Sequence, residues 1–153
     1  MKSNTRGLFS LIAIGAMALF TLVNSSVAAD LSPADKQFLA GYEKIHVALV
    51  ADDLASAKSA AAALGTPGAD LGNSKSLDEA RASFSKLSDA AEKLAAGQPG
   101  YYVLHCGMVN KDWVQTSPQP ANPYAGKDMA GCGEVKTQGT GTSCTGSSCS
   151  MCK

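Results

Sequence analysis

The stretch SLDEARASFSKLSDAAEKLA, residues 76–95, decides the fold expected for this chain. It opens with Ser76 and Glu79 three residues apart, a capping box that marks the first turn of a helix. Apolar residues then recur at spacings of three and four, as on one face of an amphipathic helix: Leu77, Ala80, Phe84, Leu87, Ala91 and Leu94. The turn residues 97–100 end the pattern. The sequence therefore predicts a helix that buries one face.

Two further helices are predicted on the N-terminal side of this stretch. The first begins at Ser32, an N-cap residue that is followed by Pro33 and by Asp35 in the first turn. Its apolar face consists of Phe38, Tyr42, Ile45 and Leu49. The second is alanine-rich, is capped by Asp52 or Asp53, and ends at the turn residues 65–68. Three helices with short connections pack best as an antiparallel bundle.

The character of the chain changes after Gly100. Residues 101–104 are aromatic and β-branched, which favours a short strand or an extended segment. Beyond Gly107 the periodicity is lost, and prolines and glycines mark turns. We therefore predict an all-α fold, an antiparallel three- to four-helix bundle. A short irregular or two-stranded appendage at its C-terminal end would carry a Cys/Met motif.

The first 29 residues have the three-part pattern of a secretory signal peptide. Lys2 and Arg6 precede an apolar run that is shorter than the ~20 residues of a membrane-spanning helix. Val27 and Ala29 are the small residues that signal peptidase accepts before its cut. We predict a periplasmic protein in three parts: a cleaved signal peptide at 1–29, a helical domain with a C-terminal metal motif at 30–136, and a flexible Cys-rich tail at 137–153.

Charge and motifs argue against several classes of function. Without Lys2 and Arg6, 11 basic residues remain against 13 acidic ones, so the mature net charge is −2. This charge gives no support to nucleic-acid binding. The sequence contains no G-x-S-x-G, no H-E-x-x-H and no P-loop. We therefore do not expect an enzyme.

All the cysteines lie in the C-terminal third of the chain, and their number is odd: Cys106, Cys132, Cys144, Cys149 and Cys152. A disulfide framework would spread its cysteines around a small core, so this crowding indicates a local task. The three methionines of the mature chain each lie within three residues of a cysteine: Met108, Met129 and Met151. This coincidence points to a site that uses sulfur.

Thiolate and thioether sulfur are soft ligands that select soft ions such as copper(I). In Cys106-x-Met108 an extended chain places both side chains on one side, and a turn would do the same for Met129-x-x-Cys132. His105 is held in reserve as a ligand, since imidazole suits copper and zinc alike. We predict a copper(I) site at these residues, with silver or zinc as alternatives. Cys149 and Cys152 would form an auxiliary capture site in the tail.

Two other interpretations of the cysteines remain open. Cys106 and Cys132 could form a disulfide that closes the proline-rich loop, which would make the protein a structural or interaction module of the envelope without a metal. Alternatively, Cys149-x-x-Cys152 could be the redox pair of a thiol oxidoreductase, although the sequence supplies no thioredoxin-like βαβ pattern around it.

The chain carries a resemblance to a known family, and its C-terminal half is the specific part. The order of residues that carries it is Cys106-x-Met108, Trp113, Asn122-Pro123-Tyr124-Ala125-Gly126 and Met129-x-x-Cys132-Gly133. This order resembles a bacterial envelope domain of unknown function, which occurs alone or fused to the C-terminus of periplasmic adaptor proteins of copper/silver efflux pumps. The resemblance covers roughly residues 40–136. The family usually has proline where this chain has Gly107, and the Cys-rich tail looks like an addition.

The resemblance implies a helical bundle with a metal-associated C-terminal motif that works in heavy-metal handling. It points to the same four sulfur residues as the spacing does: Cys106, Met108, Met129 and Cys132. We therefore predict a periplasmic binding protein for copper(I) or silver that acts as a chaperone or buffer. The expected partner besides the ion is an efflux adaptor or a metal-trafficking protein.

Overall fold

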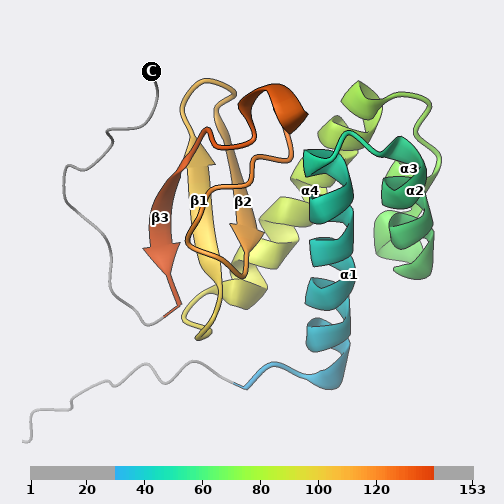
Figure 1. Ribbon diagram of the computed structural model, residues 1–153. Helices are drawn as coiled ribbons and strands as arrows, with labels where there is room; N and C mark the ends of the chain where they lie inside the picture. The colour runs from blue at the N-terminus through green and yellow to red at the C-terminus, as the bar shows by residue number, and fades with distance from the viewer. Residues whose placement is uncertain (1–29, 140–153) are drawn as a thin grey trace, which may run out of the picture.

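The computed structural model describes residues 30–139, so the predicted signal peptide and most of the Cys-rich tail lie outside the described residues. Along the chain the helices and strands are α1 Pro33–Val50, α2 Leu54–Ala63, α3 Ala69–Gly72, α4 Leu77–Ala95, β1 Tyr102–Cys106, β2 Lys111–Gln115 and β3 Glu134–Gln138. Two 3₁₀ turns, η1 Thr66–Gly68 and η2 Gly126–Met129, join them. Figure 1 shows the helices on one side of the strands.

The prediction of an all-α bundle is wrong, because the C-terminal part forms a sheet and the fold is mixed α/β. The three strands pair antiparallel in the order β2-β1-β3, with β1 in the centre. Leu104 lies opposite Trp113 in β2 and opposite Val135 in β3. A three-stranded sheet that packs against helices is independently stable, whereas a lone hairpin is marginal. The region predicted as an appendage is therefore an integral layer of the fold.

The predicted helix starts are confirmed, with two refinements. Ser32 and Asp35 cap each other at the start of α1 in a reciprocal capping box. Asp53 caps α2, whereas Asp52 adopts a left-handed conformation with φ 55°. At α4 the Ser76 side chain accepts a hydrogen bond from the Glu79 backbone N–H. The Glu79 carboxylate accepts from the backbone N–H of Lys75, one residue before Ser76.

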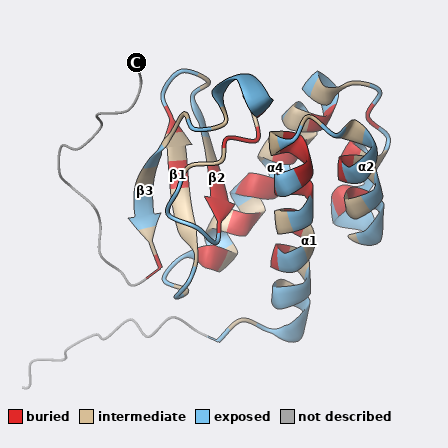
Figure 2. Cartoon of the chain, in the orientation of Figure 1, coloured by how far each residue is buried: buried red, intermediate tan, exposed pale blue. Residues whose placement is uncertain are grey.

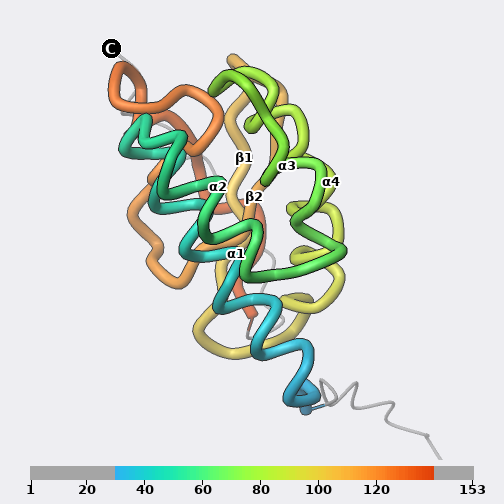
Figure 3. Tube along the Cα trace, turned by 90° about the vertical axis from the view of Figure 1, so that its right-hand side faces the viewer, coloured from blue at the N-terminus to red at the C-terminus, as the bar shows by residue number. Residues whose placement is uncertain are grey.

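Each face of the sheet buries its own apolar cluster. On the helical face, Val103 and Val114 pack against a large core contributed mainly by α1, α2 and α4. Viewed from that side, the helices lie in front of the strands (Figure 3). On the opposite face, Leu104, Cys106 and Trp113 form a smaller cluster. Figure 2 shows buried positions on the strands as well as on the helices.

A chain of hydroxyl groups ties the helices to the edge of β2. The backbone N–H of Val114 donates to the Tyr42 hydroxyl, and the Tyr124 hydroxyl donates to the backbone oxygen of Asp112. Ser88 lies between the two phenols, with an oxygen–oxygen distance of 2.8 Å to each. Because a carbonyl can only accept, the protons run from Tyr42 to Ser88 to Tyr124. The chain thus joins α1, α4, β2 and the β2–β3 connection.

None of the helices between residues 30 and 139 combines the length and the apolar character that crossing a bilayer would require.

Candidate metal centre

Cys106 and Cys132 lie side by side, although 26 residues separate them in the sequence. Cys106 ends β1, and Cys132 comes two residues before β3. The register pairs His105 with Glu134, so the end of β1 meets the chain that leads into β3. The two Sγ atoms are 2.9 Å apart. We refer to these two residues as the cysteine pair.

The separation of the two sulfurs lies between the values for two chemical states. A disulfide needs a sulfur–sulfur distance of about 2.05 Å. Two thiolates on a tetrahedral ion with metal–sulfur bonds of ~2.3 Å are about 3.8 Å apart. From 2.9 Å, either state is reached by a change of less than about 1 Å. The geometry therefore suits both.

The environment of Cys106 stabilises a thiolate. Its side chain is 1% exposed, and burial on its own raises the pKa of a thiol. Hydrogen bonds oppose this: Cys132, the backbone N–H groups of Val109 and Met108, and the side chain of Asn122 all favour the charged sulfur. Together they outweigh burial, so the pKa of Cys106 lies below its usual value. The thiolate is the form that binds metal.

Asn122 connects the two cysteine-bearing segments, although it was not among the predicted site residues. It is fully buried, and its Nδ2 donates to the backbone oxygen of Cys132 at 3.0 Å. Its Oδ1 accepts from the backbone N–H groups of Tyr124 and Ala125. A buried amide that uses both its donors and its acceptor fixes the surrounding backbone. Its signal in the sequence was its place in the stretch Asn122-Pro123-Tyr124-Ala125-Gly126, on which the predicted family resemblance partly rests.

His46 supports the same connection from the helical side. It is buried in α1, and its Nε2 lies 2.7 Å from the backbone oxygen of Ala121, the residue before Asn122. Because a carbonyl oxygen only accepts, Nε2 carries the proton. His46 was not among the predicted metal ligands, and this contact gives it a structural role.

An ion pair between Asp52 and Arg81, which we call the latch, holds the β2–β3 connection against the helices. Arg81 of α4 pairs with Asp52 and donates from Nε to the backbone oxygen of Pro123 at 3.0 Å. Asp52 Oδ2 accepts from the backbone N–H of Lys127 at 3.1 Å. This hydrogen bond and the Arg81 guanidinium hold the pKa of Asp52 below its usual value. The latch thereby fixes the segment that leads to Met129 and Cys132.

The two methionines are exposed at the same end of the sheet as the cysteine pair. Met108 lies in the β1–β2 hairpin with 69% of its surface exposed, and Met129 lies at the end of η2 with 37% exposed. Figure 1 shows the hairpin and η2 at one end of the molecule. Both side chains therefore present a thioether at the surface at this end of the sheet.

The structure does not bring His105 together with the cysteine pair. Successive side chains of a strand point to opposite faces, so His105 lies on the other face of the sheet from Cys106. There its Nδ1 is 2.5 Å from Asp112 Oδ1, and Asp112 also pairs with Lys136. Within residues 30–139, no three His, Cys, Asp or Glu side chains are grouped so that they could hold a metal. Cys149 and Cys152 lie outside the described residues.

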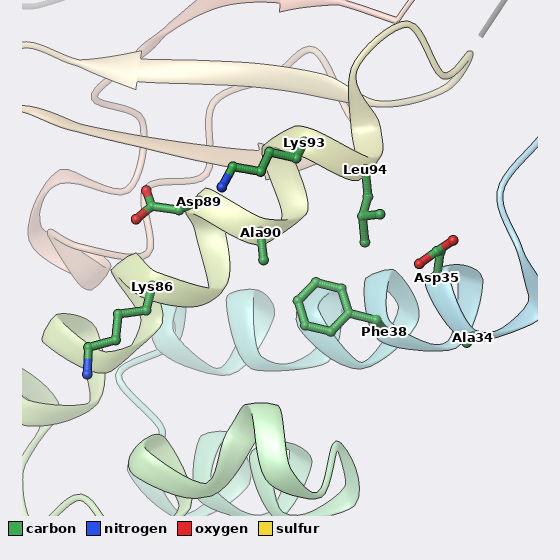
Figure 4. Close-up of a pocket in the computed structure, with 8 residues that line it drawn as sticks. All are labelled: Ala34, Asp35, Phe38, Lys86, Asp89, Ala90, Lys93 and Leu94. Carbon is green, nitrogen blue, oxygen red and sulfur yellow. The ribbon is translucent and has the colours of Figure 1, made fainter. Parts of the chain in front are cut away.

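A shallow groove between α1 and α4 is a separate surface feature. Its floor is formed by Phe38, Ala90 and Leu94, and charged residues of both signs line its sides (Figure 4). None of the predicted metal ligands lines it. We therefore assign the groove no part in the site.

Comparisons with protein-family models, with curated proteins and with solved structures found no match to this chain. The family resemblance over roughly residues 40–136 therefore stays a prediction, and the case for a function rests on the geometry of the cysteine pair.

Proposed function

We propose that this protein binds a soft metal ion, copper(I) or silver, at the cysteine pair, and that it acts in the bacterial envelope as a metal chaperone or buffer rather than as an enzyme. The observation that carries the proposal is the contact between Cys106 and Cys132, whose sulfurs are 2.9 Å apart. Two thiolates close enough to bind the same ion form the core of a soft-ion site.

The chemistry around the pair favours copper(I) over zinc. Zinc sites in proteins take Cys, His and carboxylate ligands, usually four of them. Here His105 lies on the other face of the sheet, and the sulfurs of Met108 and Met129 are the additional soft groups at the same end. Thioethers suit copper(I). The described residues thus offer a sulfur environment and no carboxylate–imidazole cage.

The burial of the ligands supports transfer by ligand exchange. Cys106 is buried, Cys132 is half-buried, and the two methionines are exposed. An ion can therefore meet thioether sulfur at the surface first and thiolate sulfur further in. A partner with its own sulfur ligands, such as an efflux adaptor or a trafficking protein, would take the ion in the reverse order. The ion would leave the thiolates first and the thioethers last. In this proposal the ion is cargo.

The test is an anaerobic copper(I) titration of the reduced chain, residues 30–153, against a competing chelator. We expect tight binding that is lost in Cys106→Ser/Cys132→Ser. The matched control is Cys144→Ser/Cys149→Ser/Cys152→Ser, which removes only tail thiols and should retain the core site. If the double variant binds as tightly as the parent chain, the ion belongs to the tail and the proposed site is wrong.

A further inference from the structure

We propose that the cysteine pair also carries out thiol–disulfide exchange with small-molecule disulfides, with Cys132 as the residue that is S-thiolated first and Cys106 as the thiol that resolves the mixed disulfide. This inference goes beyond the proposed metal binding and adds a redox-controlled state to the same residues. It rests on the unequal burial of two sulfurs in contact.

The two cysteine residues differ in exposure. Cys106 is 1% exposed, whereas Cys132 is half-buried. Gly133 on one side of Cys132 packs so closely on Trp113 that a Cβ would overlap the ring, but a Cβ on Gly131 would meet nothing within 4 Å. A disulfide must reach the sulfur that attacks it, and buried thiols are inert. An incoming disulfide therefore meets Cys132.

The resolving step follows from proximity. The Cys106 sulfur is already 2.9 Å from Cys132 Sγ, so it needs no rearrangement of the backbone to attack a mixed disulfide there. An intramolecular attack from a fixed position outpaces a second molecule in solution.

The exchange takes place in two steps. Cys132 gives its proton to solvent, and its thiolate attacks one sulfur of RS–SR, forms the mixed disulfide Cys132 Sγ–SR and releases RS⁻, which takes up a proton. The Cys106 thiolate then attacks Cys132 Sγ, forms the Cys106–Cys132 bond and expels the second RS⁻. The protein loses two electrons and two protons, and the small disulfide is reduced to two RSH molecules.

The disulfide and the metal-bound pair exclude each other. Formation of the disulfide consumes both thiolates, so no soft ligand pair remains for an ion. A bound ion would hold the sulfurs about 3.8 Å apart and occupy the electron pair that Cys132 needs for attack. Oxidation should therefore release the metal, and the metal should slow oxidation.

The experiment follows the reaction with oxidised glutathione by mass spectrometry, in a chain whose tail cysteines are replaced (Cys144→Ser/Cys149→Ser/Cys152→Ser). We expect the parent of this series to lose two hydrogens without accumulating an adduct. Adding Cys106→Ser should trap one glutathione on Cys132. Adding Cys132→Ser should give a chain whose Cys106 reacts at least about tenfold more slowly, as a buried thiol does. Equal rates in the two single-cysteine chains would overturn the proposal.

A measurement without core substitutions guards against misfolded variants. The parent reaction is quenched with acid at early times, and the transient adduct is mapped to a peptide. We expect it on the peptide that contains Cys132, and an adduct on Cys106 would refute the order. Copper(I) loading gives a separate readout, because the copper-loaded parent should form the Cys106–Cys132 disulfide more slowly. If the reduced parent binds no copper, the proposed function is wrong. The order of exchange is tested separately, by which cysteine carries the transient adduct.

Discussion

Asn122 is the residue on which the geometry of the cysteine pair depends most directly. Its side chain contacts the backbone of the segment that carries Cys132 and stabilises charge on Cys106. It is fully buried, so each of its hydrogen bonds replaces water. Metal sites commonly depend on such supporting residues for the orientation of their ligands. The pair is thus positioned by an amide that is not itself a ligand.

We expect Asn122→Asp to destabilise the protein and to weaken copper(I) binding. The carboxylate keeps the shape of the side chain but cannot donate to the Cys132 carbonyl, and its charge would face the Cys106 sulfur. A buried acceptor without its donor costs about 1–3 kcal/mol. Urea unfolding of the reduced chain measures this loss. Asn73→Asp, at an exposed position, is the matched control and should change the free energy of unfolding by less than about 0.5 kcal/mol.

The connection from β2 to β3 is the element that carries half of the site, and it has little regular structure of its own. The latch of Asp52 and Arg81 holds it on one side, and Tyr124 anchors it on the other. Gly126 lies inside the latch with φ 61°, and a Cβ there would overlap Asp52 Oδ1. Only glycine therefore fits this position without strain.

Gly126→Ala should open the latch. The new methyl group would push against Asp52 and would force alanine into a left-handed conformation, so the free energy of unfolding should fall by more than about 1 kcal/mol. Copper(I) affinity should fall as well, because the segment leads to Cys132. Gly72→Ala is the control, since a Cβ there would have its nearest neighbour at 3.8 Å. Equal melting temperatures for the two variants would show that the latch does not hold the connection.

Local pattern predicted the helices and an extended segment at residues 101–104, where β1 lies, but it did not predict β2 and β3. Caps and apolar spacing lie within a single segment, so α1, α2 and α4 were predictable from it. β3 has one apolar residue, Val135, and is defined by its pairing with the distant β1. The same distinction applies to the site. Neighbouring Cys and Met residues were visible in the sequence, but the contact of the pair with Asn122 and the position of His105 depend on the sheet register.

At the scale of the whole molecule, the hydroxyl chain makes the joining of helices and sheet sensitive to high pH. Burial raises the pKa of Tyr124 to about 12, and burial also raises the pKa of Tyr42 well above its usual value. Both phenols must stay protonated for the chain of donors from Tyr42 to Asp112 to persist. In the unfolded chain they ionise near pH 10. The folded state therefore binds protons more tightly than the unfolded state.

It follows that the free energy of unfolding keeps this contribution below about pH 10 and loses it as pH rises toward 12. For Tyr124, a shift of about two units corresponds to a loss of about 2 kcal/mol by pH 12. Urea unfolding between pH 8 and 12 measures the slope. In Tyr42→Phe/Tyr124→Phe the slope should flatten, although the variant is weaker at pH 8 because Val114 loses its acceptor. Tyr101→Phe/Tyr102→Phe removes the same number of phenols outside the chain and should retain the parent slope. If both double variants keep the parent slope, ionisation of Tyr42 and Tyr124 is not the cause of the loss of stability at high pH.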